Sequence, residues 1–128
     1  MPKAKELKVR VPDRPGTLGE ITGALAEKKI NLRAVNAWVE GDEGVIRLVA
    51  DSAAKAKKAL AAQGLQVEEQ DVLEVELADK PGALAEKATR LGAAGVNITY
   101  VFIGTAGARK ATAFIGVSDV AAALKALR

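Results

Sequence analysis

The 128-residue chain is 49% hydrophobic and 27% charged, which is typical of one ordinary globular domain or of two small ones that share a core or an interface. It contains no Cys and no His, which excludes disulfides, thiolate metal sites and the commonest general base, so we expect neither a metal nor a cofactor. The net charge of +3 is scattered and no stretch has about 18 consecutive apolar residues, so we expect a soluble, cytoplasmic protein that binds neither nucleic acid nor membranes.

The first half of the chain shows, in order, the patterns of a strand, a turn and a helix. Apolar and charged residues alternate over residues 7–11, which is the signature of a half-buried strand. Pro15-Gly16 predicts a tight turn, and apolar residues at helical spacing predict a helix over 17–28. The elements predicted next are strands at 31–40 and 44–51 joined by a turn at 41–44, a helix at 52–62 and a last strand near 65–69.

The second half repeats the first. Asp13-Arg14-Pro15-Gly16 recurs as Asp79-Lys80-Pro81-Gly82, an offset of 79 − 13 = 66 positions, which also relates a series of apolar residues. Gly95 ends the second copy's first helix, whereas Lys29 has to make the same turn in the first copy. The elements predicted here are a strand at 73–77, a helix at 83–94, strands at 97–104 and 110–117 around a turn at 105–108, and a helix at 119–127. We therefore predict two modules, at residues 1–70 and 71–128.

The order of the elements predicts the fold class. Each copy reads β-α-β-β-α-β, the α+β, ferredoxin-like arrangement in which both helices cover one face of an antiparallel sheet. The second copy lacks its own last strand, and an open sheet edge pairs readily with other strands. We expect this edge to be closed by another part of the chain or by a second subunit.

A motif D-x-P-G-x-L lies between the first strand and first helix of each copy, and Ile30-Asn31 and Val96-Asn97 open the second strands. With this combination the chain resembles, over nearly its whole length, the ACT domain family. The resemblance implies a stand-alone, tandem regulatory protein that is not an enzyme and that binds an amino acid or similar small molecule at an interface between ACT modules. It also implies a homodimer, and a metabolic enzyme or regulator as a possible partner.

The loop before each first helix can bind a zwitterion on physical grounds. Pro15 and Gly16 bring backbone amides to the helix start, where unpaired N–H groups and a partial positive charge suit a carboxylate. Asp13 can accept a hydrogen bond from a ligand ammonium group, and Asn31 offers both a donor and an acceptor. The candidate ligand-binding residues are Asp13, Arg14, Pro15, Gly16, Thr17, Leu18 and Asn31, and in the second copy Asp79, Lys80, Pro81, Gly82, Ala83, Leu84 and Asn97.

The same loop residues also have purely structural interpretations. Asp13 and Asp79 are residue types that form Asx turns or helix caps. Thr17 with Glu20 is expected to form a capping box, which would occupy the amides that a ligand needs. Because Ala83 stands where Thr17 does, we expect the second loop to be at least as open to a ligand as the first.

Other candidates have alternatives of the same kind. Asn31 and Asn97 could cap the turns that lead into their strands. Arg14 and Lys80 are expected to point to solvent, where either could steer a carboxylate. Trp38 is expected to pack in a core or an interface rather than to stack on a ligand.

Two functions from different classes fit these patterns. In the first, the chain is a sensor whose ligand changes its affinity for a partner. In the alternative it is a ligand-free oligomerisation or scaffold module that acts through protein–protein contacts, which the missing last strand favours. Catalysis is not expected, because the sequence shows no convergent constellation and no phosphate-binding loop.

Overall fold

The computed structural model describes residues 3–105 and 109–128, which form two compact units. The first unit is Lys5–Gln70. The second unit is Asp71–Arg128 together with the start of the chain, of which Lys3 and Ala4 are described. Among the described residues, no helix is long and apolar enough to cross a membrane.

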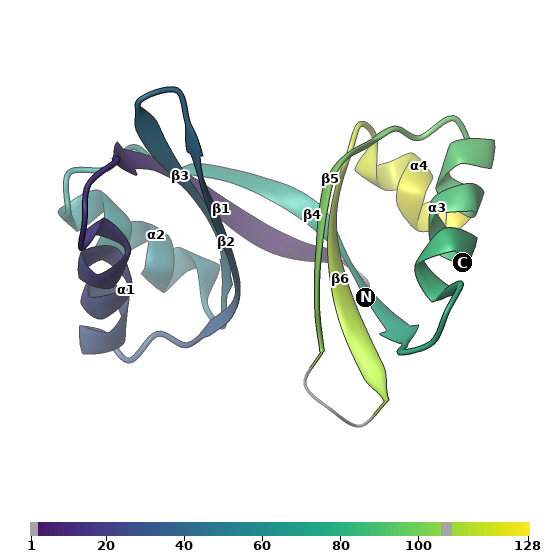
Figure 1. The fold of residues 1–128 in the computed structure, drawn as a ribbon, viewed down its shortest axis with the longest axis horizontal. Helices are drawn as coiled ribbons and strands as arrows, with labels where there is room; N and C mark the ends of the chain where they lie inside the picture. Colours follow the sequence, from purple (N-terminus) through teal and green to yellow (C-terminus); the bar gives the residue numbers. More distant parts are fainter. Residues whose placement is uncertain (1–2, 106–108) are drawn as a thin grey trace. The chain divides into compact units, whose positions relative to one another are not determined.

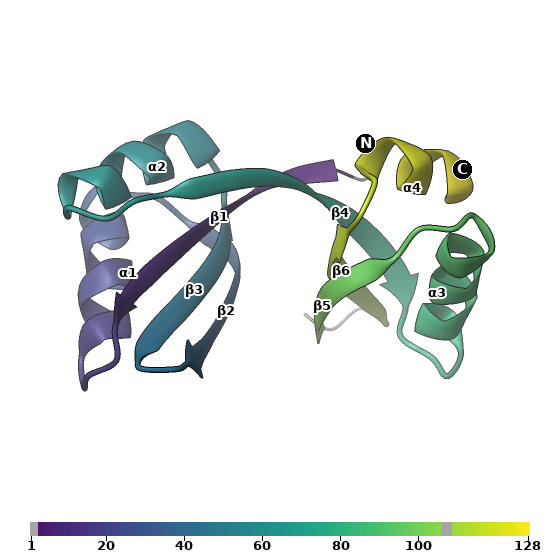
Figure 2. The ribbon, with the colours of Figure 1, turned by 90° about the horizontal axis from the view of Figure 1, so that it is seen from above.

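The first unit is a three-stranded antiparallel sheet, extended by the beginning of a fourth strand, with two helices on one face. In strand order it runs β2-β3-β1, and Figures 1 and 2 show α1 and α2 on the same side of these strands. The elements are β1 (Lys3–Pro12), α1 (Thr17–Glu27), β2 (Leu32–Glu40), β3 (Glu43–Ala50), α2 (Ala53–Ala62) and the start of β4 (Glu68–Ala78).

The predicted alternation of β1 builds the core of this unit. Leu7, Val9 and Val11 are buried and face the helices, where they pack with Leu25 of α1 and Leu60 of α2. The intervening polar side chains lie on the sheet face that the two helices leave uncovered. The α+β class predicted from the sequence is therefore confirmed, with the helices on one face of the sheet.

The second unit repeats this arrangement in the strand order β4-β6-β5, with both helices again on one face (Figure 2). Its core contains Leu73, Leu91 and Ile115, all without exposed surface. The turn predicted at 105–108 lies largely outside the described residues. The elements after β4 are α3 (Ala83–Ala93), β5 (Ile98–Thr105), β6 (Lys110–Val117) and α4 (Val120–Ala126).

The strand β4 corrects one prediction and confirms another. The separate strands predicted near 65–69 and at 73–77 are one continuous strand, Glu68–Ala78, which contains no Pro or Gly to interrupt it. Its first residues, 68–70, belong to the first unit, and the first residues of β1 belong to the second. Because β1 is the neighbour of β4, the edge left by the missing last strand is closed by another part of the same chain.

The helices α1 and α3 end in the same way with different residues. Gly95 and Lys29 both adopt left-handed backbone, with φ of 75° and 58°. In each copy the following residue donates its N–H back to a helix carbonyl, Ile30 to Leu25 at 3.1 Å and Val96 to Leu91 at 2.9 Å. The first copy thus makes the glycine turn with a residue that has a Cβ.

Lys29→Gly is expected to stabilise the chain by about 1 kcal/mol, because left-handed backbone is strained for residues other than glycine. Urea unfolding followed by the fluorescence of Trp38, the chain's one tryptophan, measures the change. Lys28→Gly is the matched control: Lys28 has φ −89°, so glycine there brings no relief and should not stabilise. An unchanged or lower stability of Lys29→Gly would contradict the argument.

Candidate functional site

A cavity of about 230 Å³ lies in the first unit beside the loop that joins β1 to α1. Asp13, Arg14, Thr17 and Leu18, four of the predicted site residues, line it. The rest of its wall is apolar or glycine and comes from the end of β1, the end of β2 and the start of β3. The loop and two neighbouring strands therefore form one concave surface.

The start of α1 carries amides without a side-chain cap. Gly16 is the N-cap residue, with φ of 90°, and no side chain hydrogen-bonds to the cap among the described residues. The capping box predicted for Thr17 and Glu20 is wrong: the Thr17 hydroxyl donates backwards, to the carbonyls of Pro12 at 3.1 Å and Arg14 at 3.0 Å. The Thr17 amide donates to the Arg14 carbonyl at 3.4 Å, which leaves the amides of Leu18 and Gly19 as first-turn donors without an acceptor inside the helix.

Glu20 is engaged by Arg14 instead of by the helix start. Arg14 donates to both carboxylate oxygens of Glu20, at 3.2 and 2.9 Å. This bidentate bond lowers the pKa of Glu20 and raises that of Arg14. Both side chains are about half exposed, so the pair orients Arg14 more than it stabilises the fold.

A second cavity, of about 440 Å³, lies beside the corresponding loop of the second unit. The predicted site residues Lys80, Pro81, Gly82 and Ala83 line it, and Gly82 repeats the uncapped left-handed helix start with φ of 89°. In contrast to Arg14, Lys80 forms no ion pair with any described residue. Its counterpart acid, Glu86, pairs with neighbours on α3.

The predicted asparagines lie just before β2 and β5, whereas the first cavity is lined by the end of β2. The backbone N–H of Asn31 donates to the Asp51 carboxylate at 3.3 Å, and the backbone carbonyl of Asn31 accepts from the backbone N–H of Asp51 at 2.9 Å. Asn97 makes the equivalent pair of contacts with Ser118, at 3.0 and 2.9 Å. Neither asparagine lines the cavity of its own unit. The remaining candidates, Pro15, Gly16, Asp79 and Leu84, are in the loops or first turn and line neither of these two cavities.

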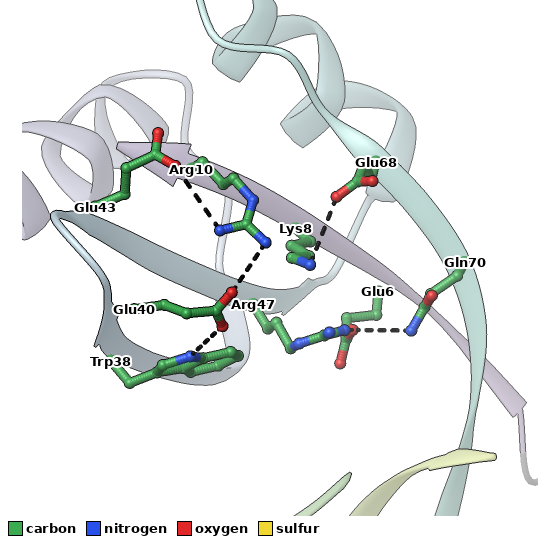
Figure 3. A network of polar contacts seen from close by, with 9 residues as sticks. All are labelled: Glu6, Lys8, Arg10, Trp38, Glu40, Glu43, Arg47, Glu68 and Gln70. Carbon is green, nitrogen blue, oxygen red and sulfur yellow. Dashed lines mark hydrogen bonds and ion pairs between the residues drawn. The ribbon is translucent and has the colours of Figure 1, made fainter. Parts of the chain in front are cut away.

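Trp38 is held by polar contacts on the sheet face that the helices leave open (Figure 3). Its indole N–H donates to Glu40 at 3.2 Å, and Arg10 donates to the same carboxylate at 3.2 Å. The two bonds lower the pKa of Glu40. The guanidinium of Arg47 lies 5.6 Å from the centre of the Trp38 ring. These contacts therefore fix the ring on this face of the sheet.

Sequence reasoning missed the part of the first cavity that comes from the β2–β3 hairpin. Ala37, Val39 and Gly44 line the cavity, and pairing sets Val39 and Val11 opposite Gly44. The hairpin signal itself was visible in the sequence. The pairing register between β3 and β1 was not visible in the sequence. That register brings Ala37, Val39 and Gly44 beside the loop.

Comparison with protein families gives one family along most of the chain. A model of the ACT domain matches residues 5–63 and again residues 72–128. The sequence has no match among curated proteins. No group of three or more metal-ligating side chains occurs in the described part of the chain.

Several solved structures are similar along nearly the whole chain. Protein BT0572 from Bacteroides thetaiotaomicron is 32% identical with a TM-score of 0.91, and the match covers 98% of this chain and 87% of that one. The regulatory subunit of aspartate kinase from Thermus flavus is 25% identical with a TM-score of 0.67, covering 99% and 91%. The ligand-free regulatory subunit from Thermus thermophilus is 23% identical with a TM-score of 0.68, covering 98% and 90%, which is a likeness of fold.

Proposed function

Because this chain belongs to the ACT domain family, we propose that it is a regulatory protein that binds an amino acid beside the loops at 13–18 and 79–84. ACT domains are regulatory modules, and two similar structures are regulatory subunits of aspartate kinase. The observation that carries the proposal is the left-handed glycine, Gly16 or Gly82, which leaves uncapped helix amides beside a cavity in each unit.

The chemistry of the first loop suits a free amino acid. The carboxylate accepts hydrogen bonds from the amides at the start of α1, where the helix dipole favours a negative charge. Asp13 lines the same cavity and receives the ammonium group. Pro15 and Gly16 contribute by shaping the turn, and their counterparts Pro81 and Gly82 do the same in the second unit. The two charged ends of the ligand thus have partners of opposite sign.

The edge strand β2 supports a site completed by a second copy of the chain. β2 ends the strand order of its unit, and Val35 and Val39 on it are 39% and 58% exposed. An antiparallel pairing of two β2 strands centred on Val35 would set Asn31 of a second copy opposite Val39, at the cavity. Asn31 would then reach a ligand across the interface, and Asn97 on the corresponding edge would do likewise.

The exposed edge valines also support the alternative function, a scaffold that assembles without a ligand. Regulation in the first proposal requires that the ligand favour one assembly over another and so change the affinity for an enzyme or regulator. The two functions therefore differ in whether an amino acid changes the stability or the assembly of the protein.

A screen of the twenty common amino acids by thermal unfolding tests the proposal. At a concentration of 100 times Kd, the ligand is expected to stabilise the protein by about 2.7 kcal/mol, because it binds only the folded chain. The D enantiomer should give a smaller shift, since it cannot place its carboxylate, ammonium group and side chain in the same three positions.

Variants of the two loops assign the response to a site. Gly16→Ala and Gly82→Ala strain the left-handed helix start and are expected to reduce the ligand shift. Gly64→Ala is the matched control: Gly64 has φ of 81° and equal space around it, but it follows α2 instead of preceding α1 or α3. If no amino acid shifts the unfolding temperature while the protein still self-associates, the scaffold function replaces the sensor.

A further inference from the structure

We infer that the cavity of the first unit selects an amino acid with an uncharged, apolar side chain, a selectivity that the second unit does not share. This inference rests on the proposed function and goes beyond it by naming the class of ligand. It comes from three differences between the two units at positions that the repeat makes equivalent.

The first difference is the apolar surface around the first cavity. Val11, Ala37 and Val39 line it, whereas the second cavity is lined by Leu77, the equivalent of Val11, but not by Ile103, the equivalent of Ala37. Val39 and Leu18 are 58% and 45% exposed. A ligand that enters with its charged ends at the loop and the helix start brings its side chain against this surface. Covering exposed apolar surface is favourable, because it removes that surface from water.

The second difference is the wall built by the hairpin. Pairing sets Gly44 opposite Val11, and in the second unit it sets Ala111 opposite Leu77. A Cβ on Gly44 would lie 3.1 Å from the Val11 side chain, so glycine keeps this part of the first cavity open.

On the neighbouring strand, the positions of Trp38 and Val39 are taken in the second unit by Gly104 and Thr105. An apolar ligand side chain therefore meets Val39 on this strand in the first unit, at the position where the second unit has a threonine.

The third difference is charge. The first cavity is lined by only two charged residues, Asp13 and Arg14, and Arg14 is bonded to Glu20 through both of its terminal nitrogens. The lining of the second cavity includes four charged residues, Glu76, Lys80, Glu86 and Lys87. A charged ligand side chain would lose water against the apolar wall of the first cavity without gaining a partner, which is costly. An apolar side chain meets no such cost.

Titration calorimetry of the full chain with L-leucine, L-phenylalanine, L-aspartate and L-lysine tests the inference. Leucine or phenylalanine is expected to bind at least tenfold more tightly than aspartate and lysine, and the comparison of the two separates an aliphatic from an aromatic ligand. Val39→Thr, which installs the second unit's residue at an exposed position, is expected to weaken binding of the preferred ligand about tenfold. Gly44→Ala should weaken it as well, by filling the cavity.

Thr105→Val is the matched control, since it makes the reverse exchange in the second unit and should leave the affinity for leucine or phenylalanine unchanged. Thermal unfolding of each variant without ligand shows that it is folded. Preferential binding of aspartate or lysine, or a Val39→Thr variant with unchanged affinity, overturns the inference and leaves the proposed function standing. Binding of none of the twenty common amino acids overturns both.

Discussion

Replacing Glu6 by valine while Arg47 is retained is expected to lower the free energy of unfolding by about 3–5 kcal/mol. Glu6 has no exposed surface, and Arg47 donates to it at 2.7 Å (Figure 3). The Arg47 side chain is itself only 13% exposed. The variant therefore leaves a largely buried positive charge without its carboxylate, a loss that urea unfolding followed by Trp38 fluorescence measures.

The second unit provides the control for this experiment. The pairing registers of the two copies make Val72 equivalent to Glu6 and Phe114 equivalent to Arg47, and both of these apolar residues are buried. The double variant Glu6→Val, Arg47→Phe is expected to recover most of the lost stability, because it removes both charges together. A single variant as stable as the original chain would show that the pair contributes little.

Gly116→Val is expected to lower the free energy of unfolding by about 1–3 kcal/mol through overpacking. Tyr100 is the cross-strand partner of Gly116, and a Cβ on that glycine would overlap the tyrosine ring. The ring then has to leave its position, at the cost of its present packing. Because Trp38 is in the other unit, calorimetric unfolding is the suitable measurement.

The first unit again shows the compensating pair. Ala34 pairs with Val49 where Tyr100 pairs with Gly116, so a small residue faces a larger one in both copies with the sizes exchanged. The double variant Gly116→Val, Tyr100→Ala should therefore be closer to the original stability than Gly116→Val alone. If the double variant is the less stable of the two, steric overlap is not the cause.

These exchanges illustrate where the repeat is informative and where it is not. The offset between the two copies predicted the order of elements, because alternation and helical spacing are properties of neighbouring residues. It also identified Lys29 as the counterpart of Gly95, and both turn out left-handed. It did not predict which cross-strand pairs are charged in one copy and apolar in the other, since cross-strand neighbours depend on register.

The candidate site shows the same division. The sequence located the loops and the left-handed glycine, because Pro-Gly restricts the backbone locally. It misjudged Thr17: with Gly16 as the N-cap, the threonine falls one position inside the helix and its hydroxyl bonds back into the loop. Glu20 is then available to Arg14. The N-cap lies one position earlier than predicted, and this shift changed the hydrogen-bond partners of Thr17, Glu20 and Arg14.

By itself, the sequence determined the duplicated α+β fold, the turn that presents helix amides and the absence of the commonest catalytic and metal-binding side chains. Only the tertiary structure decided that β4 is continuous, that β1 lies beside it, and that Val39 and Gly44 face the first loop. The reason is physical: local patterns follow from residues a few positions apart. A cavity is made by strands whose register is set by the packing of the whole sheet.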